Sequence, residues 1–348
     1  MRRSRILSGL LAATLTFTLA ACSESGSPTP SVTSATSATT SDDQAFPLTI
    51  EHAFGETTIP TLPERVATVA WGNHEVPLAL GITPVGMEKA TWGDDDGDGV
   101  LPWVEDKLNE LGGATPELFD ATDSLPFEAI ANTQPDVILA AYSGLTQEDY
   151  DQLSQIAPVV AYPDQAWGTT LEDQILMNAT ALGKEKEGGE LVAKLDGEVD
   201  AALNAHPALR ETTPVFAFFD ESDLSQIGVY TSVDPRMGFL LDAGMQEASI
   251  LEGSADSDSF YEQISAENPE AFEDVDLIIT YGSEDDTVNA DLLDKLQADP
   301  LLSRIPAIAA GRVVFLGENP TAASATPSPL SISWGIDEYF AELAEGLN

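Results

Sequence analysis

The fold is decided by residues 170–205, which read TLEDQILMNATALGKEKEGGELVAKLDGEVDAALNA. Apolar residues recur there at helical spacing, first over 171–182 and then over 191–203. The spacing predicts one long helix, with a kink near Gly188 and Gly189. At 1.5 Å per residue such a helix would run roughly 50 Å, more than the width of one small domain. We therefore expect it to brace two lobes.

Short apolar runs typical of buried strands alternate with helical segments on both sides of this stretch. Such alternation indicates parallel sheets covered by helices on both faces. We predict an α/β fold with an N-terminal lobe over 46–168, a connecting long helix over 169–207 and a C-terminal lobe over 208–348. Each lobe would hold a central parallel sheet flanked by helices. The predicted strands begin at Val66, Thr83, Asp136, Val159, Pro214, Val275 and Arg312.

Residues 1–21 have the three parts of a secretory signal: three arginines, an apolar run and small residues at the end. The apolar run is shorter than the roughly 20 residues that a spanning helix needs. Because the sole cysteine, Cys22, follows Leu19-Ala20-Ala21, the segment resembles a bacterial lipoprotein signal. That resemblance implies a lipid on Cys22 and a folded part anchored to the outer face of the cytoplasmic membrane. The alternatives are a cleaved signal without lipid and a retained transmembrane anchor.

Residues 22–45 consist mostly of Ser, Thr, Pro and Ala, so this segment is predicted to be a disordered tether. The chain has a formal charge of −45, and removal of residues 1–21 takes away three arginines and no acid, which gives −48. This charge excludes nucleic acid as a partner, because phosphate binding needs clustered Lys and Arg. Either the acids serve solubility or the ligand is neutral or cationic. No cysteine remains for an intramolecular disulfide, so a core of apolar residues must hold the fold.

Metal and catalytic motifs give little support for an enzyme. The three histidines, His52, His74 and His206, are spread along the chain, and only His74 falls near the expected cleft. Residues 94–105 match a calcium-loop pattern, with acids at positions one, three, five and twelve and glycine at six. Pro102 and the missing entering helix argue against calcium, which would be a structural ion. We expect no cofactor, no metal site and no catalytic residue.

Seven short segments follow one another in an order that is informative: 52–60, 63–66, 127–130, 134–138, 264–267, 276–279 and 328–331. Taken together, they resemble the ferric-siderophore-binding proteins of ABC importers. The resemblance covers residues 46–348 and implies two rigid α/β lobes joined by a long helix, with the ligand held between them. It also implies a monomer that delivers its ligand to a membrane permease and an ATPase on separate chains.

Glu128 and Glu267 occupy equivalent places in the two lobes, each early in a predicted helix, the second over 265–272. The resemblance implies that these glutamates pair with permease arginines, because charge complementarity sets docking orientation and rate. The alternative is that they are ordinary helix N-terminal acids favoured by the helix dipole.

Aromatic residues gather just after the predicted strands and can grip a bulky, partly apolar chelate with little loss of entropy. Arg236 begins a C-lobe helix, and its planar guanidinium could bind the oxygens of a hydroxamate or carboxylate chelate. The alternatives are core packing for the rings and a surface ion pair for Arg236. The predicted ligand-binding residues are Trp71, Trp92, Trp103, Tyr142, Trp167, Phe219, Tyr230, Arg236, Tyr281 and Trp334.

The sequence therefore predicts a lipid-anchored protein that binds an iron(III)–siderophore, of a neutral or cationic hydroxamate type. The iron would be wrapped by the siderophore, so no protein ligand to iron is needed. Haem and cobalamin stay open as ligands of the same class of protein. A calcium-stabilised extracytoplasmic enzyme or a surface adhesion module is the second hypothesis.

Overall fold

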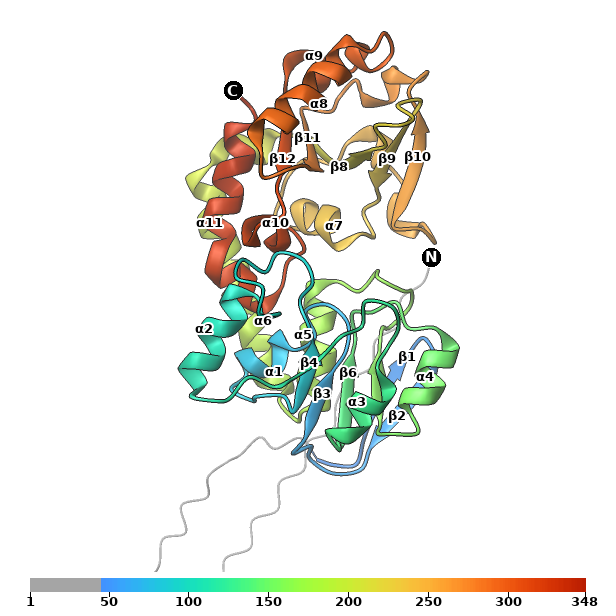
Figure 1. The fold of residues 1–348 in the computed structure, drawn as a ribbon, viewed down its shortest axis with the longest axis vertical. Coiled ribbons are helices and arrows are strands. Elements are labelled where there is room, and N and C mark those ends of the chain that lie inside the picture. The colour runs from blue at the N-terminus through green and yellow to red at the C-terminus, as the bar shows by residue number, and fades with distance from the viewer. Residues whose placement is uncertain (1–44) are drawn as a thin grey trace, which may run out of the picture. The chain divides into compact units, whose positions relative to one another are not determined.

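The computed structural model of the protein describes residues 45–348 (Figure 1). The predicted signal at 1–21, the lipidation site Cys22 and nearly all of the tether predicted for 22–45 lie outside these residues. Across 45–348, none of the helices has both the length and the apolar character needed to span a bilayer.

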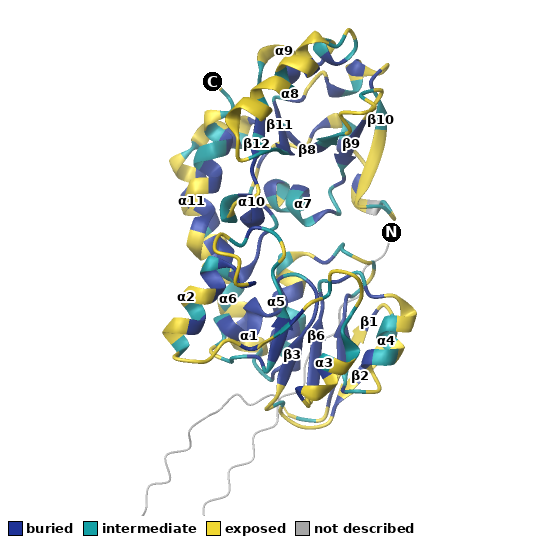
Figure 2. Cartoon of the chain, in the orientation of Figure 1, coloured by how far each residue is buried: buried dark blue, intermediate teal, exposed yellow. Residues whose placement is uncertain are grey.

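The first lobe is built on a five-stranded sheet in the order β5-β4-β3-β6-β7, and all of its neighbouring strands are parallel. These strands are almost continuously apolar and buried (Figure 2), as expected of a sheet covered on both faces. A hairpin precedes the sheet: β1 (Leu48–His52) pairs with β2 (Gly55–Ile59) in antiparallel register. The sheet comprises β3 (Val66–Thr68), β4 (Gly86–Glu88), β5 (Glu117–Phe119), β6 (Val137–Ala140) and β7 (Val159–Ala161).

Helices follow the strands of this lobe and begin at ordinary capping signals. Thr146 and Thr170 each accept a hydrogen bond from the backbone N–H three residues on, which satisfies a free donor at the helix start. Pro102 stands at the first position of its helix, where no N–H is required. The helices are α1 (Glu75–Ala79), α2 (Pro102–Leu111), α3 (Phe127–Asn132), α4 (Gln147–Leu153) and α5 (Leu171–Ala181).

The second lobe holds a five-stranded sheet in the order β10-β9-β8-β11-β12. Strands β8, β11 and β12 are parallel to one another, whereas β9 pairs antiparallel with both β8 and β10. The predicted parallel sheet is therefore mixed at this edge. The connection from β8 to β9 is too short for the crossover that a parallel pair needs. The strands are β8 (Pro214–Phe219), β9 (Gln226–Tyr230), β10 (Tyr261–Ser265), β11 (Leu277–Tyr281) and β12 (Val313–Leu316).

The prediction of a helix over 265–272 is also wrong. Residues 261–265 pair with β9, and only a short 3₁₀ turn, η4 (Pro269–Phe272), follows. The α-helices of this lobe are α7 (Pro235–Asp242), α8 (Asp286–Ala298), α9 (Pro306–Ala310), α10 (Pro320–Ser324) and α11 (Pro329–Glu345). The other 3₁₀ turns are η1 (Pro207–Glu211), η2 (Ser249–Leu251), η3 (Ser254–Asp256) and η5 (Leu302–Arg304).

The stretch predicted as one connecting helix is divided into α5 and α6 (Glu185–Ala205). The break falls at Gly183, whose φ of 68° is the left-handed conformation that ends helices. Gly188 lies inside α6, and a Cβ there would stand 2.5 Å from the Ala179 Cβ of α5. This glycine therefore permits two helices to pack closely rather than producing the kink that we predicted. At 21 residues, α6 spans about 32 Å.

Two helices link the lobes side by side, because α11 packs along α6 (Figure 1). Between them, Ser333 Oγ accepts a hydrogen bond from Lys194 Nζ (2.9 Å) and donates one to Glu198 Oε2 (2.6 Å). The long α6 and its partner α11 thus form a paired connection, in place of the single rod expected from the sequence.

A buried carboxylate ties the N-lobe to the start of α11. Glu75 opens α1 and is fully buried; it accepts hydrogen bonds from Trp103 Nε1 (2.8 Å) and from the backbone N–H of Leu330 (3.0 Å). Burial raises the pKa of Glu75, while hydrogen bonds, including one from Ser328, lower it part of the way back. The carboxylate therefore satisfies one of the free N–H groups at the N-terminus of α11 and joins residues 255 positions apart in the chain.

Replacement of Glu75 by Ala should lower the free energy of unfolding by about 3 kcal/mol, because two buried N–H donors lose their acceptor. Urea unfolding followed by far-UV circular dichroism measures this. Glu105→Ala, at an exposed position of α2, should change the free energy by less than about 0.5 kcal/mol. Equal effects of the two substitutions would contradict the role assigned to Glu75.

Candidate functional site

Three aromatic residues follow strands of the N-lobe at their carboxyl ends, where ligands of open α/β sheets bind. Trp71 comes after β3, Tyr142 after β6 and Trp167 after β7. Tyr142 and Trp167 make an edge-to-face contact with ring centroids 5.3 Å apart. Gly144 makes room for this contact, since a Cβ there would lie 2.2 Å from the indole Nε1 of Trp167.

The loop after β4 carries a ring from the N-lobe across to the C-lobe. Trp92 lies 6.4 Å from Trp71 and meets Tyr281, the last residue of β11, edge-on at 5.1 Å. Gly93 packs against α10, because a Cβ on it would stand 2.3 Å from the Cβ of Ala323. The two lobes are therefore in contact through rings.

In the C-lobe, Arg236 lies at the centre of an aromatic group. Its guanidinium carbon is 3.8 Å from the ring centroid of Tyr230, 5.5 Å from that of Phe216 and 5.8 Å from that of Tyr281. Asp234 binds the same guanidinium through both carboxylate oxygens, at 2.8 Å from Nε and 2.6 Å from Nη2. The result is a largely buried ion pair lying over aromatic faces.

The charges of this pair act on both lobes. Burial by itself would lower the pKa of Arg236, but the hydrogen bonds and charge of Asp234 outweigh it, so the pKa lies above its usual value. Burial raises the pKa of Tyr142, the charge of Asp234 raises it further, and Arg236 partly offsets the rise. Since Tyr142 belongs to the N-lobe, these effects place it opposite the C-lobe ion pair.

Seven of the ten residues predicted to bind ligand thus come together, and three do not. Trp103 is 3% exposed and donates to Glu75, and Trp334 on α11 lies 5.2 Å from it, so this pair belongs to the lobe junction. Phe219 points to the face of β8 opposite Phe218, as alternation along a strand requires. The residues brought together are Trp71, Trp92, Tyr142, Trp167, Tyr230, Arg236 and Tyr281.

Sequence reasoning missed Phe218, Tyr261 and Asp234. Phe218 lies 5.5 Å from Tyr230 and 5.4 Å from Tyr261, both measured between ring centroids. Side chains alternate between the two faces of a strand, so the pattern within 214–219 could have shown that Phe218 shares a face with Phe216 and that Phe219 does not. The Asp-Pro pair before α7 could have identified Asp234 as a capping residue, since an acid followed by proline is a helix-start signal.

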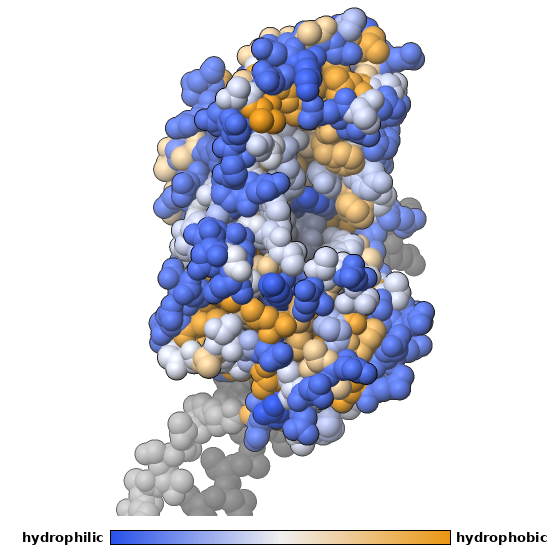
Figure 3. All heavy atoms as spheres, viewed as in Figure 1, coloured by the Kyte–Doolittle hydropathy of each residue, from blue (hydrophilic) through white to orange (hydrophobic). Residues whose placement is uncertain are grey.

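The surface is hollowed between the lobes (Figure 3). Two cavities differ in their lining: the smaller includes Trp71, and the larger includes none of the seven residues brought together. A small one, about 40 Å³, is lined by Trp71, His74, Glu88 and Lys89 among others. A wide groove of about 1270 Å³ is lined by residues that flank Trp167 and Arg236 in the chain, such as Gly168 and Pro235. The groove exceeds the usual size of a small-molecule site and can accommodate a bulky ligand.

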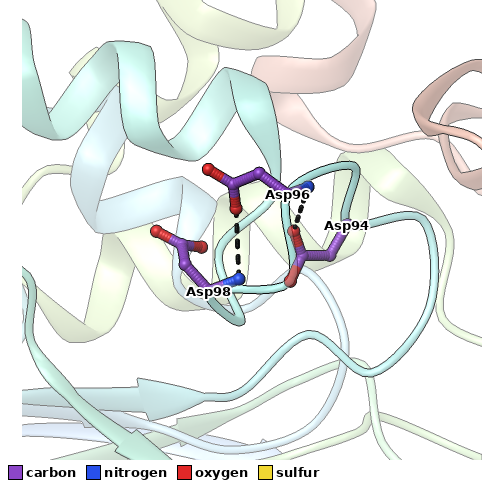
Figure 4. Close-up of side chains that lie close together, drawn as sticks. All are labelled: Asp94, Asp96 and Asp98. Carbon is purple, nitrogen blue, oxygen red and sulfur yellow. Dashed lines mark hydrogen bonds between the residues drawn. The ribbon is translucent and has the colours of Figure 1, made fainter.

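The acidic loop after Trp92 brings three carboxylates together (Figure 4). Oxygens of Asp94, Asp96 and Asp98 lie within 4.8 Å of one another. Although burial opposes it, backbone N–H groups of the loop, first that of Gly99, hold the pKa of Asp94 below its usual value. Glu105, the twelfth position of the calcium pattern, is not part of this group. The carboxylates cap turns of their own loop, and we assign no metal here.

The histidines do not form a metal site within residues 45–348. His52 bonds Thr57 inside the hairpin at 2.9 Å, His74 is buried beside the small cavity, and His206 ends α6. Burial lowers the pKa of His74 to about 4, so this side chain is neutral at physiological pH. In this part of the chain the acidic loop is the single group of three possible ligands.

Two sheet-built lobes joined by long helices, with rings facing each other between them, define a two-lobed solute-binding protein. The chain belongs to the periplasmic binding protein family, whose sequence pattern matches residues 66–320. The solved structure of PiaA from Streptococcus pneumoniae TIGR4 in complex with ferrichrome is 46% identical, with a TM-score of 0.80, and covers 86% of this chain and 98% of that one.

Curated relatives agree with this assignment. A probable siderophore-binding lipoprotein of Bacillus subtilis, YfiY, is 32% identical over 158 residues, and the match spans 45% of either chain. The ferric-anguibactin-binding protein FatB of Vibrio anguillarum is 25% identical over 78% of this chain and 80% of its own length. Staphylococcus aureus SirA, at 23% identity and a TM-score of 0.64, shares the fold.

Gly144→Ala should displace the Trp167 ring and lower the free energy of unfolding by about 1–3 kcal/mol, because an added methyl overlaps the indole. Near-UV circular dichroism should register the loss of the Tyr142–Trp167 contact. Gly189→Ala is the matched control: nothing lies within 4 Å of its Cβ position, and alanine in a helix should stabilise by up to about 1 kcal/mol. An unchanged near-UV spectrum in Gly144→Ala would contradict the assigned packing.

Proposed function

We propose that this chain is an extracytoplasmic solute-binding lipoprotein that captures an iron(III)–siderophore between its lobes and delivers it to an ABC permease for iron uptake. The observation that carries the proposal is the group of rings from both lobes around Arg236. It occurs in a chain 46% identical to a protein crystallised with ferrichrome. The alternative of a calcium-stabilised enzyme or adhesion module has less support, because the family consists of solute-binding proteins.

The chemistry of the site suits a chelate that already encloses its iron. Rigid rings offer large contact area at small entropic cost, and three guanidinium N–H bonds not used on Asp234 can reach ligand oxygens or the Tyr281 phenol. None of the histidines or acids of the described chain is required to coordinate the metal. A neutral or cationic hydroxamate chelate fits this site better than haem or cobalamin, the other ligands considered for this class of protein.

The proposed function places the chain at a membrane as a monomer. A lipid on Cys22 would hold it at the outer face of the cytoplasmic membrane, with residues 22–45 as the tether. The permease and its ATPase are separate chains. Glu128, exposed at the second position of α3, and Glu267, exposed in the turn after β10, would pair with permease arginines.

Titration of the mature protein with a panel of ferric chelates should quench tryptophan fluorescence, with the strongest response to neutral or cationic hydroxamates. Arg236→Gln should weaken that binding by about 10- to 100-fold, because hydrogen bonds from a charged donor are lost. Arg210→Gln is the control, since Arg210 pairs with exposed Asp200 at 3.0 Å on the connecting helix. A lack of quenching by every chelate in the panel would refute the proposed function.

The docking role has its own test. The double variant Glu128→Lys and Glu267→Lys should bind the chelate with unchanged affinity but support less permease-dependent iron uptake, because charge complementarity is reversed. A second double variant, Glu105→Lys and Glu190→Lys, makes the same charge change at exposed positions elsewhere and should transport normally. Equal loss in both variants would instead indicate a general effect of net charge.

A further inference from the structure

Asp234 is the residue on which this inference rests. Its side chain is 4% exposed, and its carboxylate accepts three hydrogen bonds from one residue: the backbone N–H of Arg236 (3.0 Å), Nε (2.8 Å) and Nη2 (2.6 Å). It therefore caps α7 and neutralises the guanidinium at once. The bidentate geometry is the strongest that a carboxylate and an arginine adopt.

The surroundings of the pair contain no excess of positive charge. The small cavity near Trp71 is lined by one basic and one acidic residue, Lys89 and Glu88. The side chains lining the wide groove, within the part of the chain described, include seven carboxylates and no lysine or arginine. The groove carboxylates are Asp164, Glu172, Asp196, Asp200, Asp242, Glu247 and Asp258.

An unpaired arginine in such a site would attract anionic ligands, because desolvated charges interact strongly. With Asp234 bound to it, Arg236 keeps its remaining N–H donors but contributes no net charge. A ligand that brings negative charge would then meet a chain of formal charge −45 without an unpaired cation at Arg236.

We propose that Asp234 is a specificity-determining residue: it reduces Arg236 to a neutral hydrogen-bond donor and so makes the site select uncharged or cationic iron chelates over anionic ones. This proposal rests on the proposed function and adds the residue that sets the charge preference. Asp234 acts through Arg236 and is therefore a positioning residue.

The test compares Asp234→Asn with Asp276→Asn. Asparagine at 234 keeps an oxygen to cap α7 but loses the charge. Asp276 also pairs with an arginine, Arg312 (3.6 Å), but directly before β11, at the opposite end of that strand from Tyr281. Both variants change the net charge equally, and only the first changes the charge at the ligand site.

The probes are three chelates that carry iron-binding hydroxamates and differ in charge: neutral ferrichrome, cationic ferrioxamine B and anionic ferric aerobactin, in which a hydroxycarboxylate completes the iron coordination. Wild-type protein should prefer the first two. In Asp234→Asn the ratio of the Kd for ferric aerobactin to that for ferrichrome should fall at least tenfold, or about 1.4 kcal/mol. In Asp276→Asn the ratio should change by less than about twofold.

An unchanged ratio in a folded Asp234→Asn variant, or an equal loss of affinity for all three chelates, would overturn the proposal and leave Asp234 a purely structural residue. Failure of the wild-type protein to bind any of the three would refute the proposed function instead.

Salt provides a measurement on the wild-type chain that does not depend on how the variant folds. If Arg236 is fully compensated, a rise from about 20 to about 500 mM NaCl should leave the affinity for ferric aerobactin unchanged or increase it, because salt screens repulsion from the acidic chain. An affinity that falls with salt would reveal an unpaired cation and would likewise overturn the proposal.

Discussion

One buried carboxylate, that of Glu75, ties the N-lobe to the start of α11. It lies at the start of α1 and binds both an indole N–H of the N-lobe and the first turn of α11. A buried carboxylate is costly unless its oxygens are hydrogen-bonded, so this contact is maintained only in one relative placement of the two elements. The positions of Trp92 and Tyr281, and hence the closure of the ring group, follow from that placement.

Around this junction, the ligand site is assembled from strand ends that lie far apart in the sequence. β3, β6 and β7 deliver Trp71, Tyr142 and Trp167 to one edge of the N-lobe sheet, while β11 delivers Tyr281 from the other lobe. Each ring thus comes from a segment whose position is fixed by a buried sheet. Each part of a site built in this way is therefore rigid.

Much of this arrangement was predictable, because buried strands and the hairpin depend on local patterns of apolar residues. The two lobes and the family were predictable from the sequence. Seven of the ten residues predicted to bind ligand come together, and their binding role stays a prediction. The break at Gly183 was not predicted, because a glycine in the left-handed conformation and one at a helix crossing look alike in a sequence; Gly188 is the second kind. β10 was not predicted, because its pairing with β9 depends on residues some thirty positions earlier.

Trp103 and Phe219 lie away from the ring group for a similar reason. Trp103 follows a Gly- and Asp-rich loop, as a rim residue would, yet its indole N–H has a buried carboxylate to bind, and this partner lies 28 residues away. Phe219 is one position out of phase with the ring-bearing face of β8. A distant hydrogen-bond partner determines the position of Trp103, and the phase of the strand determines that of Phe219. The composition of the sequence around these residues indicates neither.

The contacts of Trp92 with Trp71 and Tyr281, and of Tyr142 with Trp167, have a consequence for how the protein captures its cargo. These rings contact one another, so a chelate that binds among them would exchange ring-to-ring contacts for ring-to-ligand contacts. Such aromatic pairs are worth about 0.5–1.5 kcal/mol each beyond simple burial. The affinity for the chelate then reflects a difference between two sets of contacts. It is lower than the contacts made with the chelate alone would give, and this limits how tightly the ligand is held.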